Sequence, residues 1–336
     1  MSAKKMIGCL SVVSFLACLL MGSLFGATAS AQQKAEFKFD IASVLDSTHP
    51  IVLGGNLWGK IIAEKTKGRV VVNVYPNSQL GGNRETAQAT QNGLIQGYLD
   101  SSTLTSSFVP QLAVFDLPYL AKNTDEVIRI LDSPLAEELS QLAIKAGLRP
   151  MGLWEATLRS VYSSKIRINS INDLKGMKIR VIPSPSYVIV FKALGASPTP
   201  MSFGELYTAL AQGTVDAAEN DMVTYYTSKH YEVAKNYAIT NHIFLADTLW
   251  ISEKYFTKMP DDIKKIMIDA AKEVQVFVRQ NRAERDKKAE ETLKAAGVTI
   301  THPDLKPFIE IGRKTYPQFE EKLGKDLIGK VQALVK

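Results

Sequence analysis

Three polar residues lie at the ends of predicted strands and have the chemistry to hold a carboxylate. Arg180 lies near the end of the run Met177–Val181, Asn220 follows the run Val215–Ala218, and Arg159 precedes a third short run. A guanidinium group binds a carboxylate through two parallel hydrogen bonds, and a carboxamide can donate a third. Ligands of α/β proteins also bind at the carboxyl ends of strands. Taken alone, an arginine after a strand is more often a solvated surface residue, so both interpretations stay open here.

Five further residues are candidates for the wall of a binding site. Phe203 is expected to face a ligand, although an aromatic residue on a helix is usually core. Glu219 can accept hydrogen bonds from ligand hydroxyls, or it can face solvent. Ser101 begins a hydroxyl-rich segment that either forms a rim for a sugar or caps the next helix. Asn83 follows a Gly-Gly pair at a helix start, where an anion can bind or a turn simply needs glycine. His49 opens a helix and reaches either the cleft or solvent.

The motifs of the common enzyme classes are absent from the sequence. It has no G-x-S-x-G turn, no H-E-x-x-H helix, no Walker loop and no G-x-G-x-x-G turn. The four histidines are not spaced like the ligands of a metal site, so we expect no bound metal. Because the enzyme motifs are absent, we also expect no cofactor and no catalytic residue. This pattern favours a binding protein over an enzyme.

Composition and charge exclude several other classes. The 336 residues are 46% hydrophobic and 22% charged, which is typical of a globular protein of about two domains. The formal net charge of +6 is mild and comes without a dense basic run, so nucleic acid is not an expected partner.

The first 31 residues have the three-part pattern of a secretory signal peptide. Two lysines precede an uncharged apolar run over 6–25, and the small residues Ala29–Ala31 precede a polar start. We therefore predict cleavage after Ala31 and export of the remainder. The alternatives are an uncleaved membrane anchor, because the run approaches the length of a bilayer, and lipid attachment at Cys18. Both cysteines of the chain lie in this segment.

The remaining chain alternates predicted strands and helices in two successive groups. That order is typical of an α/β fold with parallel strands and helices on both faces. Apolar periodicity also predicts one charge-laced helix over 261–296 and an amphipathic helical end over 305–335. Strands are predicted over 36–41, 69–75, 97–99, 151–154, 160–162, 177–181, 215–218 and 248–251, and helices over 50–66, 85–92, 126–131, 136–146, 187–194 and 203–212.

Chain crossings near residues 155 and 245 suggest two lobes joined by a hinge. We predict that lobe 1 contains 32–156 and about 246–284, and that lobe 2 contains 157–245 and about 285–336. A helix as long as the one predicted over 261–296 would span both lobes.

Several longer motifs resemble one family closely. The chain is similar to the solute-binding subunits of tripartite ATP-independent periplasmic (TRAP) transporters, the DctP family, over nearly all of its length after the leader. The resemblance implies a two-lobed periplasmic binding protein fold of type II-like topology, with a long helix behind both lobes. It rests on Tyr75–Gly81, Asp116–Tyr119, Asp173–Val181, Lys192–Met201, Phe203–Leu210, Gly213–Asn220, His230–Lys235 and Thr240–His242.

The resemblance also implies roles for the polar residues. It implies that Arg180 pairs with a ligand carboxylate, that Asn220 donates to the same group, and that Arg159 either touches the ligand or braces the site. It implies periplasmic capture of a small organic acid and delivery to TRAP membrane permease subunits. We expect a monomer.

The motifs indicate the chemical class of the ligand less clearly than they indicate the family. The segment around Asn220 and His230 looks most like that of members that bind sugar acids such as uronates and aldonates, and the hydroxyl-rich segment suits a polyol. Asp221, where relatives often have Asn or Pro, departs from the family pattern. The alternatives are a C4-dicarboxylate or other small carboxylate, a periplasmic enzyme, and a ligand sensor.

Overall fold

The computed structural model describes residues 35–335, and the predicted signal peptide lies outside this range. The ten strands in this range form one continuous sheet. Its main path has the order β2-β1-β3-β9-β5-β8-β6-β7, while β4 and β10 also pair with β9. The sheet is therefore mixed, with parallel groups at both ends and antiparallel strands in the middle.

The first parallel group is built from the strand–helix alternation that the sequence predicts. β1 (Phe37–Ser43) pairs in parallel with both β2 (Val70–Tyr75) and β3 (Gly97–Ser101). The connecting helices are α1 (Pro50–Lys65) and α2 (Asn83–Asn92). Parallel strands require such crossovers, and the crossovers leave the carboxyl ends of the strands at one edge.

The second parallel group contains the residues of the DctP-like motifs. β6 (Lys178–Val181) pairs in parallel with β7 (Ser197–Pro200) and β8 (Ala217–Asn220). The connecting helices are α6 (Pro185–Ala193) and α7 (Leu206–Ala211). The short strand β7 was not predicted, because two prolines in four residues hide a strand.

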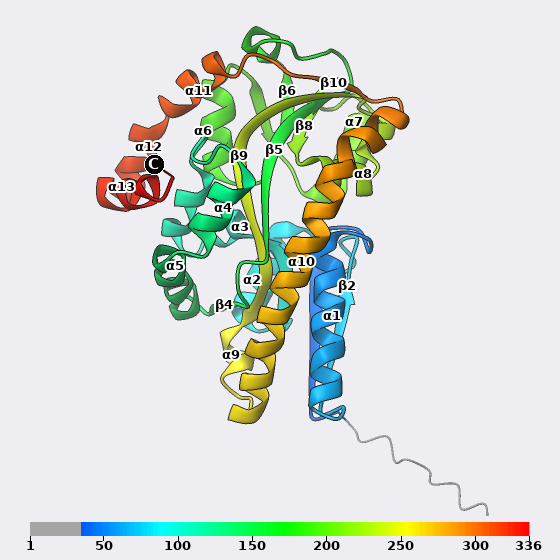
Figure 1. The fold of residues 1–336 in the computed structure, drawn as a ribbon, viewed down its shortest axis with the longest axis vertical. Coiled ribbons are helices and arrows are strands. Elements are labelled where there is room, and N and C mark those ends of the chain that lie inside the picture. The colour runs from blue at the N-terminus through cyan, green and yellow to red at the C-terminus, as the bar shows by residue number, and fades with distance from the viewer. Residues whose placement is uncertain (1–34, 336) are drawn as a thin grey trace, which may run out of the picture. The chain divides into compact units, whose positions relative to one another are not determined.

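Two long antiparallel strands connect the groups. β9 (Asn236–Ser252) pairs with β3 through its second half and with β5 (Glu155–Ser163) along most of its length. Figure 1 shows β5 and β9 side by side through the middle of the fold. Their register shifts between Arg159 and Val161, which is a β-bulge and therefore a site of local bending.

Side-chain hydroxyls replace regular ladder contacts at this bulge. The Ser160 Oγ accepts hydrogen bonds from the backbone N–H groups of Thr240 and Asn241, each at 3.1 Å. The Val161 N–H donates to the Thr240 Oγ1 at 3.1 Å. The backbone of Asn241 has φ +44°, a left-handed conformation that asparagine tolerates better than most residues.

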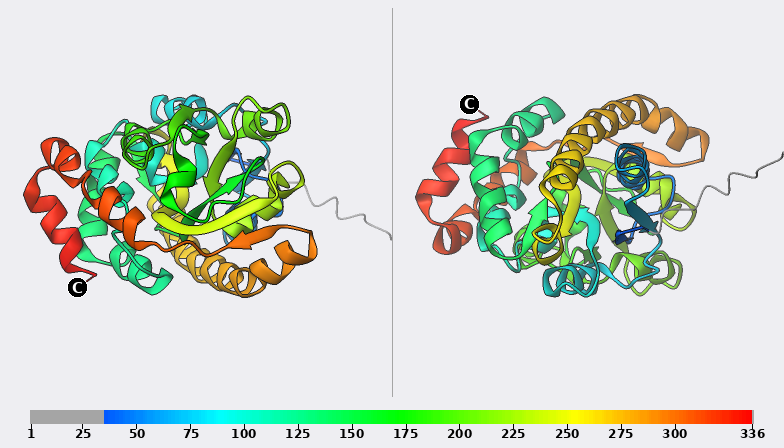
Figure 2. Two further views of the ribbon diagram at one scale, coloured as in Figure 1. Left: turned by 90° about the horizontal axis from the view of Figure 1, so that it is seen from above. Right: turned by 90° about the horizontal axis from the view of Figure 1, so that it is seen from below.

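The helix α10 (Asp261–Ala295) is the long helix expected from the sequence. At about 1.5 Å per residue its length is about 50 Å. It packs against α1, as Figures 1 and 2 show, and further along against α8 (Met222–Thr227) and β5. Gly54 permits the close approach of α1, because a Cβ there would lie 2.5 Å from a methyl group of Val278.

The remaining elements cover the sheet or connect its strands. The end of the chain is helical as predicted, but as three helices, because Pro317 and the left-handed Gly324 interrupt it. The strand predicted over 151–154 lies earlier, as β4, because Gly152 has φ +85°. The other elements are α3 (Ser102–Thr105), η1 (Pro110–Asp116), α4 (Thr124–Leu131), α5 (Pro134–Lys145), β4 (Leu148–Pro150), η2 (Ile171–Leu174), η3 (Phe203–Glu205), η4 (His230–Glu232), α9 (Glu253–Phe256), β10 (Thr299–Thr301), α11 (Lys306–Arg313), α12 (Tyr316–Leu323) and α13 (Lys325–Ala333).

Candidate functional site

A small cavity lies where the carboxyl ends of strands from both parallel groups meet. Its volume is about 30 Å³, which is room for about two ordered water molecules. Strands β5 and β9 contribute the floor residues between the two groups. The cavity is lined by Val44, Leu45, Asn83, Asp100, Arg159, Arg180, Ile182, Phe203, Asn220, Thr224, Leu245 and Asp247.

Arg180, on β6, lines this cavity with a guanidinium group that is only partly hydrogen-bonded. Its Nε donates to the backbone oxygen of Met201 at 2.9 Å, and its Cζ lies 5.5 Å from the ring centre of Phe203. Its Nη1 is buried and has no hydrogen-bond partner within residues 35–335. Burial lowers the pKa of Arg180, and the nearby Glu219 carboxylate opposes that effect. An arginine in this state has donors available for an anion.

Asn220, the last residue of β8, is oriented by its neighbours. Its Oδ1 accepts from the Arg159 Nη1 at 2.7 Å and from the backbone N–H of Asp221 at 3.0 Å. Because both neighbours are donors, they fix which end of the carboxamide is the oxygen. The Nδ2 group of Asn220 is thereby left as a hydrogen-bond donor at the cavity.

Arg159 also lines the cavity, but most of its donors are used inside the protein. Its Nε donates to Glu219 Oε2 at 2.5 Å, and its Nη2 donates to Glu219 Oε1 at 2.8 Å and to the Glu219 backbone oxygen at 2.7 Å. Together with its bond to Asn220, this leaves a single N–H of the guanidinium group unassigned. The geometry is that of a residue that braces the site.

Glu219 lies behind the cavity and not in its wall. It is fully buried, and its Oε2 also lies 3.3 Å from the Nε2 of His242. Burial alone would raise its pKa, but the Arg159 guanidinium and the His242 imidazole together outweigh burial and lower it. Burial lowers the pKa of His242, even though the carboxylate opposes this. From the sequence, we expected Glu219 either to contact ligand hydroxyls or to face solvent. Its buried position behind the cavity wall differs from both expectations.

Phe203 and Asn83 meet at the cavity from different halves of the chain. The backbone N–H of Phe203 donates to Asn83 Oδ1 at 3.0 Å, while Asn83 Nδ2 donates to Asp100 Oδ2 at 2.6 Å. Asn83 is the first residue of α2, and both residues are largely buried. This contact connects the two predicted lobes.

Ser101 and His49 are buried but do not line the cavity. The Ser101 Oγ has no hydrogen-bond partner within the described part of the chain. His49 caps α1 through its Nδ1, which accepts from the Ile51 N–H, and its Nε2 lies 2.9 Å from Thr224 Oγ1. Burial lowers the pKa of His49, so it is a neutral structural residue next to a wall residue.

Two acids of the cavity wall were not among the predicted residues. Asp100 is the penultimate residue of β3, and Asp247 lies on β9, within an apolar segment. Burial raises the pKa of Asp100 to about 6 and that of Asp247 well above its usual value. Sequence features could have identified both acids as site residues. Asp100 comes directly after a predicted strand, and Asp247 is an acid within a buried strand.

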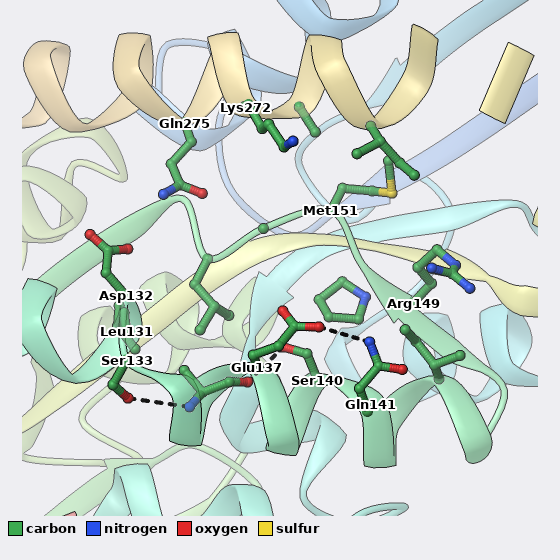
Figure 3. A pocket seen from close by; sticks show the side chains of 17 residues that line it. Leu131, Asp132, Ser133, Glu137, Ser140, Gln141, Arg149, Met151, Lys272 and Gln275 are labelled. Carbon is green, nitrogen blue, oxygen red and sulfur yellow. Dashed lines mark hydrogen bonds between the residues drawn. The ribbon is translucent and has the colours of Figure 1, made fainter. Parts of the chain in front are cut away.

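A larger pocket lies elsewhere on the protein. It has a volume of about 350 Å³ and lies between α5, the segment after β4, and α10. Figure 3 shows its labelled residues, which include Asp132, Glu137, Arg149 and Lys272. None of the predicted site residues lines it, so its size alone does not make it the ligand site.

Neither a metal-binding cluster nor a membrane-spanning helix is present among residues 35–335. Within residues 35–335, no three histidine, cysteine or acidic side chains come together in a way that could hold a metal ion. Across that range, no helix combines the length and apolarity needed to cross a membrane.

The fold and site define a class of protein. A two-lobed α/β fold with a long backing helix, and a cavity between the lobes that contains arginines and an asparagine, is the architecture of a periplasmic solute-binding protein. The family model of the bacterial extracellular solute-binding proteins, family 7 (DctP), matches residues 41–322. The chain belongs to this family.

Individual relatives agree with the assignment. The sialic acid-binding periplasmic protein SiaP of Vibrio cholerae is 32% identical, over 81% of this chain and 85% of that protein. A TRAP periplasmic solute-binding protein of Xanthobacter autotrophicus, solved with β-D-galacturonate, is 31% identical, with a TM-score of 0.84 over 88% of this chain and 99% of the other. One from Sulfurospirillum deleyianum, solved with succinate, is 32% identical, with a TM-score of 0.85 over 90% of this chain and all of the other.

These findings confirm the family and the two-lobed fold predicted from the sequence. The family and its solved neighbours are ligand-binding transport proteins and not enzymes. The chain is therefore a TRAP-type solute-binding protein.

Proposed function

We propose that this protein captures a sugar acid, such as a uronate or aldonate, in the cavity between its lobes. Arg180 and Asn220 hold the ligand carboxylate. The observation that carries the proposal is the buried Nη1 of Arg180, which has no partner in residues 35–335 and lies in the cavity wall. A buried donor without a partner is costly, and a carboxylate would satisfy it.

Arg159 acts on the ligand mainly through Asn220. Its bonds to Glu219 and to Asn220 Oδ1 hold the carboxamide so that Nδ2 faces the cavity. This supports the bracing role over direct pairing, which were the two roles considered from the sequence.

The lobes must separate to admit the ligand. A sugar acid is far larger than the two waters for which the cavity has room, so entry requires an opening motion. The contacts that would break include Asn83 with Phe203 and His49 with Thr224. The hinge proposed near residues 155 and 245, and the lobe boundaries given above, are consistent with the long strands β5 and β9 that connect the two groups.

The cellular setting follows from the family and the leader. We propose that residues 1–31 are removed on export, that the mature protein is a monomer in the periplasm, and that it delivers its ligand to TRAP membrane permease subunits. N-terminal sequencing of exported protein should give Gln32, and finding Met1 or a lipid on Cys18 would contradict the leader assignment.

Titration calorimetry with a panel of organic acids tests the site. Arg180→Ala should weaken binding on the order of a hundredfold or more, because a charge-assisted pair contributes roughly 1.5–3 kcal/mol per hydrogen bond and each 1.4 kcal/mol is about tenfold. Arg180→Lys should recover only part of this, since an ammonium lacks the two-pronged geometry. Circular dichroism should show that both variants are folded. A folded Arg180→Ala that binds as tightly as the parent would refute the assignment.

A further inference from the structure

The buried arginines around the cavity differ in whether they have a carboxylate partner. Three arginines are buried in or near it, and two of them already have carboxylate partners. Arg159 is paired with Glu219. Arg282, on α10, is paired with Glu155 and with Asp221, the latter at 2.5 Å. Among the described residues that line the cavity, Arg180 is left as the single cation without a carboxylate partner.

The other half of the sheet supplies acids to the same cavity. Asp100 accepts the Ser101 N–H at 2.7 Å and the Asn83 Nδ2 at 2.6 Å, so both of its oxygens are engaged. Asp247 is 5% exposed and lines the cavity, and its Oδ1 is buried without a partner in residues 35–335. Glu155 lies next to Asp247 in the sheet, at the paired position on β5.

The wall of the cavity therefore suits one ligand carboxylate together with neutral polar groups. One ligand carboxylate matches the one unpaired cation, Arg180. A second carboxylate would share the wall with Asp247 and Asp100, and beyond Arg180 it would find no unpaired cation among the wall residues within 35–335. Burial raises the pKa of Asp247 and of Asp100 because this cavity disfavours a negative charge, and a second ligand carboxylate without a cation beside it is unfavourable there for the same reason. A hydroxyl, in contrast, can donate to the free oxygen of Asp247 and accept from a neighbour.

We propose that Asp247, supported by Asp100, is the specificity-determining residue of this site, selecting hydroxylated monocarboxylates and rejecting dicarboxylates. This inference rests on the proposed function, in which Arg180 and Asn220 hold the first carboxylate. It goes further by naming the residue that distinguishes sugar acids from C4-dicarboxylates. The solved relatives include proteins with either kind of ligand, so the family alone does not decide between these two classes for this chain.

A matched pair of ligands provides the test. D-Erythronate and succinate are both four carbons long, but erythronate has a hydroxymethyl group where succinate has its second carboxylate, and it has two further hydroxyls on the carbons between. Titration calorimetry on the mature protein should show that erythronate binds on the order of a hundredfold more tightly than succinate. This measurement needs no variant, so it tests the preference for hydroxylated monocarboxylates even if a substitution at Asp247 prevents folding.

The variant Asp247→Asn removes the acid but keeps the size and a polar group. It should narrow the preference for erythronate by at least about tenfold, by weakening erythronate, by strengthening succinate, or by both. Asp269→Asn, at an exposed acid on α10, changes the net charge equally and should leave the preference unchanged.

The possible failures are distinguishable. A parent protein that binds succinate as tightly as erythronate, or a folded Asp247→Asn with an unchanged preference, would overturn the specificity role while leaving carboxylate capture intact. A parent that binds no acid on the panel would overturn both the proposed function and this inference.

Discussion

Arg159 and Arg180 offer a matched comparison between an arginine that supports the fold and one held for a ligand. Both are almost fully buried, and both line the cavity. Their partners differ, since Arg159 pairs with Glu219 whereas Arg180, within residues 35–335, bonds only to the backbone oxygen of Met201. Replacing each arginine with methionine keeps much of the apolar bulk and removes the charge, so the two variants can be compared directly.

The expected effects on stability follow from what each variant leaves behind. Arg159→Met leaves the Glu219 carboxylate buried with His242 alone, and such a loss typically costs about 3–5 kcal/mol. Arg180→Met loses one hydrogen bond, worth roughly 1.5–3 kcal/mol, but also removes a buried charge that has no carboxylate partner. We therefore expect the free energy of unfolding of Arg180→Met to lie within about 1 kcal/mol of the parent value, or above it.

Urea unfolding followed by circular dichroism, without ligand, measures both quantities. The double variant Arg159→Met/Glu219→Gln should regain part of the stability lost in Arg159→Met, because it no longer leaves a carboxylate unpaired. If Arg180→Met loses 3 kcal/mol or more, Arg180 is a structural residue and the reasoning from its unpaired Nη1 is wrong.

Three further predictions concern motion, pH and packing. Small-angle scattering should show a smaller radius of gyration with saturating ligand, and an unchanged radius would count against lobe closure. Burial raises the pKa of Asp116 to about 7, so the folded chain keeps a proton that the unfolded chain loses above about pH 4. Relative to Asp116→Asn, the parent should therefore lose on the order of 4 kcal/mol of stability between pH 4 and pH 8 in urea titrations, and parallel pH profiles would contradict this. Gly54→Ala should lower the free energy of unfolding by about 1–3 kcal/mol, because its Cβ would meet Val278. The matched control Gly329→Ala, where nothing lies within 4 Å, should be neutral or stabilising, and equal losses in both variants would exclude the packing explanation.

Much of the fold was predictable from local patterns. The parallel strands and their crossover helices have strong apolar periodicity, and α10 was bounded within one residue by its charge-laced pattern. What local patterns did not show was long-range pairing. β9 is a single strand of 17 residues whose two halves pair with different neighbours, and no short window of sequence contains that information.

The site was predictable to the extent that motifs identify it. Arg180, Asn220, Arg159, Phe203 and Asn83 all line one cavity, although their roles toward a ligand stay a prediction. Three other candidates are buried beside the cavity, namely Glu219, Ser101 and His49. The sequence did not show this, because the position of a residue along the chain does not tell which way its side chain points. Asp247 was missed because an acid within an apolar strand gives no motif.

The bulge between Arg159 and Val161 has a consequence for amide hydrogen exchange. The N–H groups of Val161 and Asn241 are protected by the hydroxyls of Thr240 and Ser160 in place of backbone carbonyls. A side-chain rotation is enough to release them, so these two amides should exchange faster than those amides of β5 and β9 that donate to backbone carbonyls. Since Arg159 stands at the same bulge, ligand binding should slow exchange at this point even though the amides do not touch the ligand. Ligand binding and bending of the sheet at the bulge are in this way connected through a single residue, Arg159.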